Sequence, residues 1–101
     1  MENKFRPDMV VKHFDWRLLK NGAERAKAVL SFTIYFNPSD RPNKYAVRPM
    51  FTKEQNITPL PVIIVGNTYE EVLNKIPIEE LKLVCFAREV EDDKVIIETW
   101  L

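Results

Sequence analysis

The segment 26–36, AKAVLSFTIYF, alternates between apolar and polar side chains more regularly than any other part of the chain. Successive side chains of a β-strand point to opposite faces of a sheet, so a period of two predicts a half-buried strand. The sequence therefore predicts a sheet with one apolar face. On that face we expect Ala28, Leu30, Phe32, Ile34 and Phe36.

The preceding segment 10–20, VVKHFDWRLLK, alternates less strictly and is followed by Asn21-Gly22, a pair typical of hairpin turns. Apolar residues meet apolar ones across such a hairpin only if its loop has an odd number of residues, three or five. The five-residue loop, Asn21 to Arg25, sets Phe14 opposite Phe32. A helix through this region is the alternative. It would carry the glycine at its centre and run into β-branched and aromatic residues, so we expect the hairpin.

The segment 45–53, YAVRPMFTK, predicts a further strand, and Pro49 indicates its place in the sheet. Proline has no backbone N–H and cannot donate to a ladder of hydrogen bonds. We therefore expect this strand at an edge of the sheet or at a bulge. The flanking segments 37–44 and 54–61 contain prolines among polar residues and predict loops.

The residues 62–65, VIIV, are apolar on both faces, which is typical of a central strand. A helix is predicted directly after them, over about 68–76, because Thr68 and Glu71 fit a capping box and Pro77 disfavours its continuation. A strand–Gly–helix junction of this kind can hold a phosphate on its free N–H groups. Here we expect Thr68 and Glu71 to occupy those groups instead.

The last segment, 82–101, predicts a second hairpin that turns at Asp92-Asp93. A two-residue loop at this position matches the apolar faces of its two arms. The predicted register sets Cys85 opposite Trp100, Phe86 opposite Thr99 and Val90 opposite Val95.

These elements follow one another as ββββ-α-ββ and predict an α+β fold. We expect an antiparallel or mixed β-sheet of about five to six strands, with one main helix, 68–76, packed on one face. The 101 residues, of which 46% are hydrophobic, are expected to form a single compact domain over 1–101. Roughly the first seven residues are expected to be loose.

The composition excludes several classes of function. Fifteen Lys and Arg balance fifteen Asp and Glu, which argues against a dedicated nucleic-acid binder and against a polyanionic mimic. Glycine occurs only at 22 and 66, so a Gly-rich phosphate loop is absent. The single cysteine cannot form an intramolecular disulfide, and no signal peptide or membrane-spanning run is present. We therefore expect a cytoplasmic protein.

The residues that could support catalysis are few. His13 is the sole histidine, and Asp15 shares its face of the predicted strand, so a nucleophilic site would have to use this pair. A polar strand face accounts for both residues without catalysis. Cys85 lies in the apolar run LVCFA, where we expect a buried thiol with no basic neighbour to lower its pKa. The sequence predicts no catalytic residue, no metal site and no cofactor, and thus not an enzyme.

The clearest local signal for binding is the stretch 41–53, RPNKYAVRPMFTK, which contains no acidic residue. Basic side chains track phosphates and aromatic rings stack on bases, so the pattern fits contact with a single-stranded nucleic acid. It also fits an edge strand whose charges and prolines prevent aggregation, or one that receives a partner's strand. The candidate contact residues are Arg41, Lys44, Tyr45, Arg48 and Lys53.

The segment LPVIIVGNTYEEVLNKI, 60–76, resembles part of the HicB-type antitoxins. In that family a Leu-Pro pair precedes a short strand, Gly-Asp-Thr and a helix that begins with two acids. Asn67 stands where the family has Asp, and Val62 where it has Gly. The resemblance implies a shared local arrangement of strand and helix, and not membership of the family. The matching residues are Leu60, Pro61, Gly66, Thr68, Glu70, Glu71 and Leu73.

We therefore expect a small, non-catalytic intracellular module for protein–protein interaction, such as an inhibitor, an antitoxin-like protein or an accessory protein. Its partner is a protein, and a second copy of the chain is one candidate. Nucleic-acid binding through 41–53 is the less favoured alternative, and no membrane association is expected.

Overall fold

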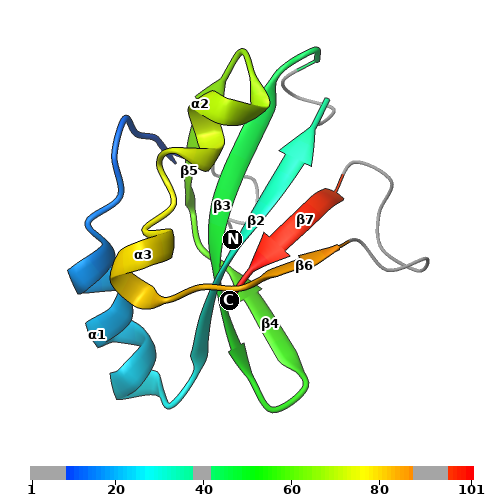
Figure 1. Cartoon of the computed structure of the whole chain (residues 1–101). Helices are drawn as coiled ribbons and strands as arrows, with labels where there is room; N and C mark the ends of the chain where they lie inside the picture. Colours follow the sequence, from blue (N-terminus) through cyan, green and yellow to red (C-terminus); the bar gives the residue numbers. More distant parts are fainter. Residues whose placement is uncertain (1–8, 38–41, 88–95) are drawn as a thin grey trace, which may run out of the picture.

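The computed structural model describes residues 9–37, 42–87 and 96–101 (Figure 1). Its seven strands form one sheet in the order β1-β5-β3-β2-β7-β6, and β4 also pairs with β3. The β1–β5 pair is parallel and the other pairs are antiparallel. The fold is therefore α+β with a mixed sheet. In chain order the elements are β1 (Met9–Val10), α1 (Trp16–Ala26), β2 (Val29–Phe36), β3 (Tyr45–Lys53), β4 (Asn56–Pro59), β5 (Val62–Gly66), α2 (Tyr69–Leu73), α3 (Ile78–Leu81), β6 (Cys85–Ala87) and β7 (Ile96–Trp100).

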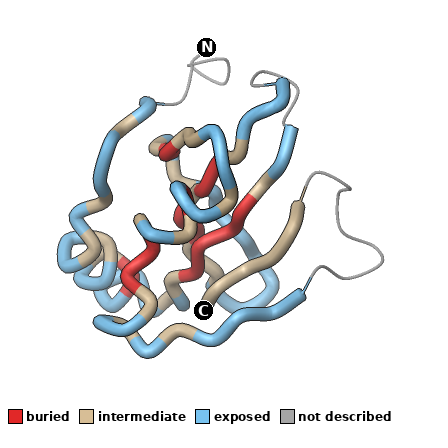
Figure 2. The backbone as a smooth tube through the Cα atoms, turned by 45° about the horizontal axis from the view of Figure 1, so that its top comes forward, coloured by how far each residue is buried: buried red, intermediate tan, exposed pale blue. Residues whose placement is uncertain are grey.

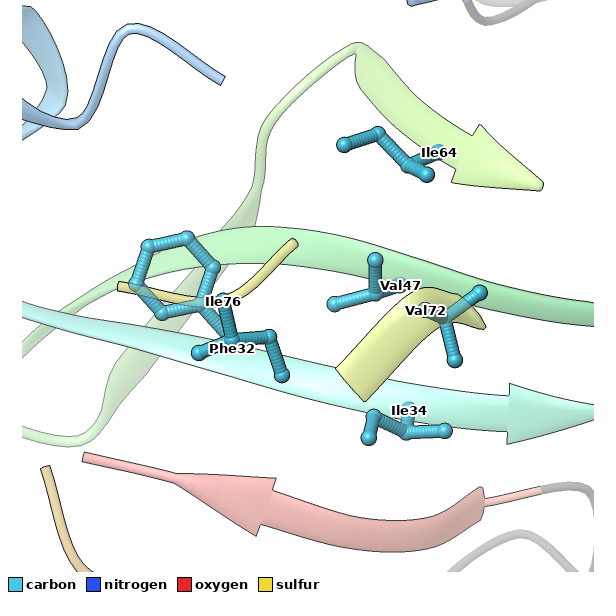
Figure 3. Packing of buried hydrophobic residues seen from close by; sticks show 6 residues of the cluster. All are labelled: Phe32, Ile34, Val47, Ile64, Val72 and Ile76. Atoms are coloured by element: carbon cyan, nitrogen blue, oxygen red, sulfur yellow. The ribbon is translucent and has the colours of Figure 1, made fainter. Parts of the chain in front are cut away.

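The core lies between one face of the sheet and the helices. Phe32 and Ile34 of β2 are fully buried there, which confirms the face predicted from the alternation. Val47 lies opposite Ile34 on β3, and Figure 3 shows both beside Val72 of α2. Side chains from all three helices contact this cluster, so no single main helix covers the sheet. The helical contacts come from Leu19, Tyr69, Val72, Leu73, Ile78 and Leu81.

The predicted hairpin over 10–36 is wrong, because residues 16–26, from the end of its first arm through its loop, form the helix α1. Asp15 caps that helix, with its Oδ1 accepting the Leu18 N–H at 3.2 Å. At the other end Lys27 adopts a left-handed conformation, and the Ala28 N–H closes the last turn. Phe14 does contact Phe32, with ring centroids 5.7 Å apart, but from the segment that leads into α1 rather than from a strand.

Gly22 explains why the sequence pointed to a turn. It lies inside α1, where an added Cβ would come within 3.3 Å of the Phe51 ring. The glycine therefore lets the helix approach β3 closely, at a cost in helix propensity of about 1 kcal/mol relative to alanine. That close approach depends on the tertiary structure and leaves no local pattern in the sequence.

The strand β3 is central, and the prediction that it forms an edge is wrong. It pairs with β2 along its whole length, and on its other side with β5 at Tyr45–Val47 and with β4 at Met50–Lys53. Pro49 lies where the partner changes. Its carbonyl accepts the Leu60 N–H at 3.0 Å and therefore points away from β2. In an antiparallel strand the N–H and C=O of one residue point to the same side, so the N–H that proline lacks would also point away from β2. A proline is thus tolerated because neither neighbouring ladder needs its donor.

The C-terminal hairpin has the predicted register. Cys85 lies opposite Trp100, and Phe86 lies opposite Thr99. The predicted turn at Asp92-Asp93 and the Val90–Val95 pair lie outside the described residues. Figure 1 shows β7 between β2 and β6, so that β6 ends the sheet.

The region around β5 agrees with the sequence in part. Ile63 and Ile64 are both buried, and β5 pairs with β1 and β3, as expected of a central strand. The helix predicted over 68–76 is shorter than expected, because α2 spans Tyr69–Leu73, and a separate helix, α3, follows Pro77. The segment 54–61, predicted as a loop, contains the additional strand β4. The observed order of elements therefore differs from ββββ-α-ββ, and the predicted loose residues fall in 1–8, outside the described residues.

Candidate functional site

The basic residues of the stretch 41–53 do not gather on one surface. Lys44 precedes β3 and Lys53 ends it, which separates them by about 30 Å at the rise of an extended strand. Arg48 is half-buried between them, and its Nη1 donates to the Leu60 carbonyl at 2.7 Å. The described members of this candidate site therefore lie in three different environments.

The aromatic member of that candidate site, Tyr45, faces the core. Its ring centroid lies 4.7 Å from that of Phe36 and 6.4 Å from that of Tyr69. The side chain is half-buried and contacts the core cluster, so its ring is already packed against protein. Arg41, the remaining candidate, lies outside the described residues.

His13 and Asp15 do not share the strand face predicted for them. Both lie in the segment between β1 and α1, where Asp15 caps the helix. The Nδ1 of His13 lies 3.3 Å from the Nζ of Lys75 instead. Among the residues that the structure describes, no group of three or more His, Cys, Asp and Glu side chains could hold a metal ion.

A polar cluster around Glu98 joins the sheet to α2. The Tyr69 hydroxyl and the Trp100 Nε1, the latter at 2.8 Å, both donate to Oε2 of Glu98. Burial, followed by the bond to Glu98 and its charge, raises the pKa of Tyr69 far above its ordinary value. The Tyr69 hydroxyl therefore acts as a donor that holds α2 against β7, whereas the bond from the indole to Glu98 lies within β7.

The Cys85 thiol belongs to the same region but is exposed, so the expectation of a buried cysteine is wrong. Desolvation, and then the neighbouring Glu98 carboxylate, raise the pKa of this thiol. This agrees with the predicted lack of a neighbour that would lower it. A thiol of this kind is a poor nucleophile at neutral pH, since the thiolate is the reactive form.

The strand–Gly–helix junction is a packing device. An added Cβ at Gly66 would lie 3.0 Å from the Cβ of Glu71 and 3.1 Å from Val72, so the glycine allows α2 to begin against β5. The Glu71 carboxylate accepts the N–H groups of Asn67 and Thr68, and the Thr68 hydroxyl accepts that of Glu71. The predicted capping box is confirmed, and its N–H groups are not available to a phosphate.

A groove of about 660 Å³ lies beside this junction. Its cationic groups are Lys44 and Lys75, and the Lys44 ammonium contacts the side-chain oxygen of Asn67. Its acid, Glu71, is engaged in the capping box. Of the predicted basic residues, Lys44 lines this groove.

The clearest unpaired surface is the edge of the sheet at β6. Val84 and Leu101 exchange both backbone hydrogen bonds, at 2.8 and 3.0 Å. Bonded and non-bonded pairs alternate along an antiparallel ladder, so the N–H and C=O groups of Cys85 and Ala87 point away from β7. No described strand pairs with that side of β6. We call the outward N–H and C=O groups of Cys85 and Ala87, together with the side chains of residues 84–87, the β6 edge.

The side chains of the β6 edge are apolar and accessible. Val84 is 58% exposed and Phe86 51% exposed, and Figure 2 shows the whole of β6 as exposed beside the half-buried β7. Phe86 lies opposite Thr99, and Thr99 lies opposite Thr33, so the three side chains share one face of the sheet. The neighbours of Thr33 in β2, Phe32 and Ile34, face the core, so Phe86 points to the sheet face away from the helices. Leu101 and Val29, 44% and 54% exposed, belong to the same face.

The β6 edge lacks the features that usually protect an exposed edge. Residues 83–87, LVCFA, include no charge and no proline. By contrast β1, at the other end of the sheet, has two residues, and β4 contains Pro59. The neutral run was visible in the sequence, but the pairing of 82–101 as a hairpin did not show which of its arms would be outermost.

In comparisons with known proteins, no family model, no curated protein and no solved structure matches the chain. The segment that resembles the HicB-type antitoxins forms the strand β5 and the capped helix α2. None of the helices in the described part of the chain has the length and apolar character needed to cross a membrane.

Proposed function

We propose that the chain is a non-catalytic protein–protein interaction module that binds a partner's strand along the β6 edge. The observation that carries this proposal is the unpaired, uncharged backbone edge at Cys85 and Ala87, flanked by the exposed side chains of Val84 and Phe86. In strand addition, main-chain hydrogen bonds supply affinity and alternate side chains supply specificity. The β6 edge offers unpaired main-chain groups for such hydrogen bonds and exposed alternate side chains for such contacts.

The environments of the titratable groups support a non-catalytic role. Asp15 caps α1, Glu71 completes the capping box and Glu98 accepts from two donors, so these three carboxylates have structural partners. A matched test replaces His13 with alanine. If that change abolished a measured turnover while the circular dichroism spectrum stayed native, the proposal of a non-enzyme would fail.

The binding site is tested by affinity capture from the native host with nuclease-treated controls and mass spectrometry. Phe86→Lys adds a charge to the β6 edge, and we expect it to remove the captured partner. Ile57→Lys is the matched control, because Ile57 is 63% exposed and lies on the same sheet face, on β4. Equal capture by both variants would place the binding site elsewhere.

Nucleic-acid binding stays as the alternative, and the groove beside β5 is the observation that favours it. Lys44 and Lys75 line that groove, and cations of this kind contact phosphates. A nucleic-acid complex should weaken steeply as salt rises. If an oligonucleotide binds in this manner and Lys44→Glu with Arg48→Glu removes the binding, the alternative prevails. If the double variant keeps all of its affinity, binding through 41–53 is excluded.

A further inference from the structure

We propose that the strand which pairs with the β6 edge belongs to a second copy of the chain, so that two sheets join antiparallel about a two-fold axis. The inference rests on the proposed function, because it names the partner of the same edge. It commits to one register, with Cys85 of one copy opposite Cys85 of the other and Val84 opposite Phe86. Three features of the β6 edge lead to it.

The first feature is the direction of the backbone groups. Only Cys85 and Ala87 present their N–H and C=O groups outward among the described residues of β6. An added strand must therefore form its hydrogen-bonded pairs with these two residues. With a second copy in antiparallel orientation, the bonded pairs are Cys85 with Cys85, Cys85 with Ala87, or Ala87 with Ala87.

The second feature is the match of side chains in each register. With Cys85 opposite Cys85, each exposed Val84 lies opposite the exposed Phe86 of the other copy. With Cys85 opposite Ala87, the two Phe86 rings face each other, but Val84 has no apolar counterpart within the described strand. With Ala87 opposite Ala87, neither Val84 nor Phe86 has one. The first register is the one that pairs every exposed apolar side chain of the edge.

The third feature is charge. In an isologous contact, a residue near the two-fold axis lies close to the same residue of the other copy, so a charge there would face a like charge. The run LVCFA contains none. A neutral apolar strand is complementary to itself, and Leu101 and Val29 extend the apolar surface on the same face. The other described edges are less suited, because β1 has two residues and β4 carries Pro59.

The contact is short, and this sets the expected strength. Residues 84–87 contribute one pairing segment per copy, which is well below the area of a standard stable interface. We therefore expect a reversible dimer with a Kd in the micromolar range or weaker, on the order of 10 to 1000 µM. Sedimentation equilibrium over a matching range of concentrations measures it.

Variants at the edge give the first arm of the test. Phe86→Lys is expected to weaken dimerisation about tenfold or more, because each lysine then lies opposite the apolar Val84 of the other copy and loses water there. Ile57→Lys, on the same sheet face but distant from β6 in strand order, is expected to leave the Kd unchanged. If Phe86→Lys does not fold, Ala87→Pro replaces it, since proline at this position removes an outward N–H and no bond to β7.

Crosslinking gives the second arm and tests the register. Cys85 is the only cysteine, and a hydrogen-bonded antiparallel pair holds its Cα atoms about 5.5 Å apart, within the range of a disulfide. Diamide at mildly alkaline pH should therefore crosslink the wild type through Cys85, and Phe86→Lys should suppress the product although its thiol is retained. In Cys85→Ser with Phe86→Cys the proposed register predicts little crosslinking, whereas the register with facing Phe86 rings predicts a strong product.

The outcomes separate the inference from the proposed function. A chain that stays monomeric up to about 1 mM overturns the second-copy inference, as does dimerisation that Phe86→Lys and Ala87→Pro leave unchanged. If the chain is monomeric but captures a host protein in a Phe86-dependent manner, the proposed function holds and only the identity of the partner is wrong. If neither dimerisation nor capture responds to Phe86→Lys, both are wrong.

Discussion

The strand β3 has the sequence of an edge strand but lies inside the sheet, whereas β6 has the sequence of an interior strand but lies at the edge. β3 carries Pro49 and basic residues, which are typical of a protected edge, yet it has partners on both sides. β6 is neutral and apolar, which is typical of an interior strand, yet it ends the sheet. The difference shows that edge-like residues can be absorbed inside a sheet when their polar groups find particular partners.

Each edge-like residue of β3 is accommodated in its own way. Pro49 lies at the junction of two partner strands, where its missing donor leaves no gap in a ladder. Arg48 donates to the Leu60 carbonyl at that same junction. Lys53 reaches solvent at the end of the strand. The β6 edge has no such accommodation, and an unpaired neutral edge of this kind favours association with another strand.

The largest expected effect comes from the same substitution made at both strands. Val47 of β3 is fully buried, whereas Val84 beside β6 is 58% exposed. Val47→Ala should cost about 2–3 kcal/mol of unfolding free energy, because it leaves a cavity in the core. Val84→Ala should change it by less than about 0.5 kcal/mol. Urea unfolding measures both, and equal losses would contradict the contrast between the two strands.

A pair of proline substitutions tests the direction of the backbone groups in β6. Phe86→Pro removes a donor to β7 and should cost about 2 kcal/mol, from the lost hydrogen bond and the unpaired Thr99 carbonyl. Ala87→Pro removes an outward donor and should cost less than about 1 kcal/mol. Thermal unfolding of the two variants distinguishes them. A larger loss for Ala87→Pro would mean that the outward and inward residues of β6 are interchanged.

The polar cluster that attaches α2 to β7 should contribute less than the core. Tyr69→Phe removes the donor to Glu98, and we expect a loss of about 1–2 kcal/mol near neutral pH. The pKa of Tyr69 is raised in the folded state, so its contribution is complete below the ordinary pKa of tyrosine, about 10, and declines as pH rises above it. Unfolding near neutral pH and at alkaline pH should show the difference between wild type and variant narrowing. A difference that grew with pH would contradict the assignment.

The smallest effect concerns the helix that covers the inner face of β3. Thr68→Ala removes the cap of α2 and should cost about 1 kcal/mol. Thr68→Ser keeps a hydroxyl for the Glu71 N–H and serves as the control. Since Val72 of α2 packs in the same cluster as Val47, hydrogen exchange should rise in β3 more than in β6. Equal changes in both strands would show that α2 stabilises them alike.

The parts of the fold that local pattern predicted are those in which neighbours along the chain supply the interactions. The alternation placed Phe32 and Ile34 on the core face, and the match of apolar faces placed Cys85 opposite Trp100. The capping box was predicted from the spacing of Thr68 and Glu71. In the candidate site, the neutral run of the β6 edge could be read from the sequence, but its exposure could not.

The errors arose where distant residues decided the outcome. The Asn21-Gly22 pair predicts a turn, whereas the Phe51 ring accounts for a glycine inside α1. Pro49 predicts an edge strand. In the structure it lies between the part of β3 that pairs with β5 and the part that pairs with β4, where no ladder needs its N–H. The candidate residues Lys44 and Lys53 are close in sequence, but an extended strand holds them at opposite ends.

The sequence by itself determined which residues alternate, where α2 is capped and how the two C-terminal strands pair. These follow from backbone geometry and from contacts between residues close in the chain, which a linear pattern records. Only the tertiary structure decided the order of the strands, the helical state of 16–26 and the position of β6 at the edge. These depend on which apolar faces find each other across the whole chain, and several orders satisfy the same local pattern.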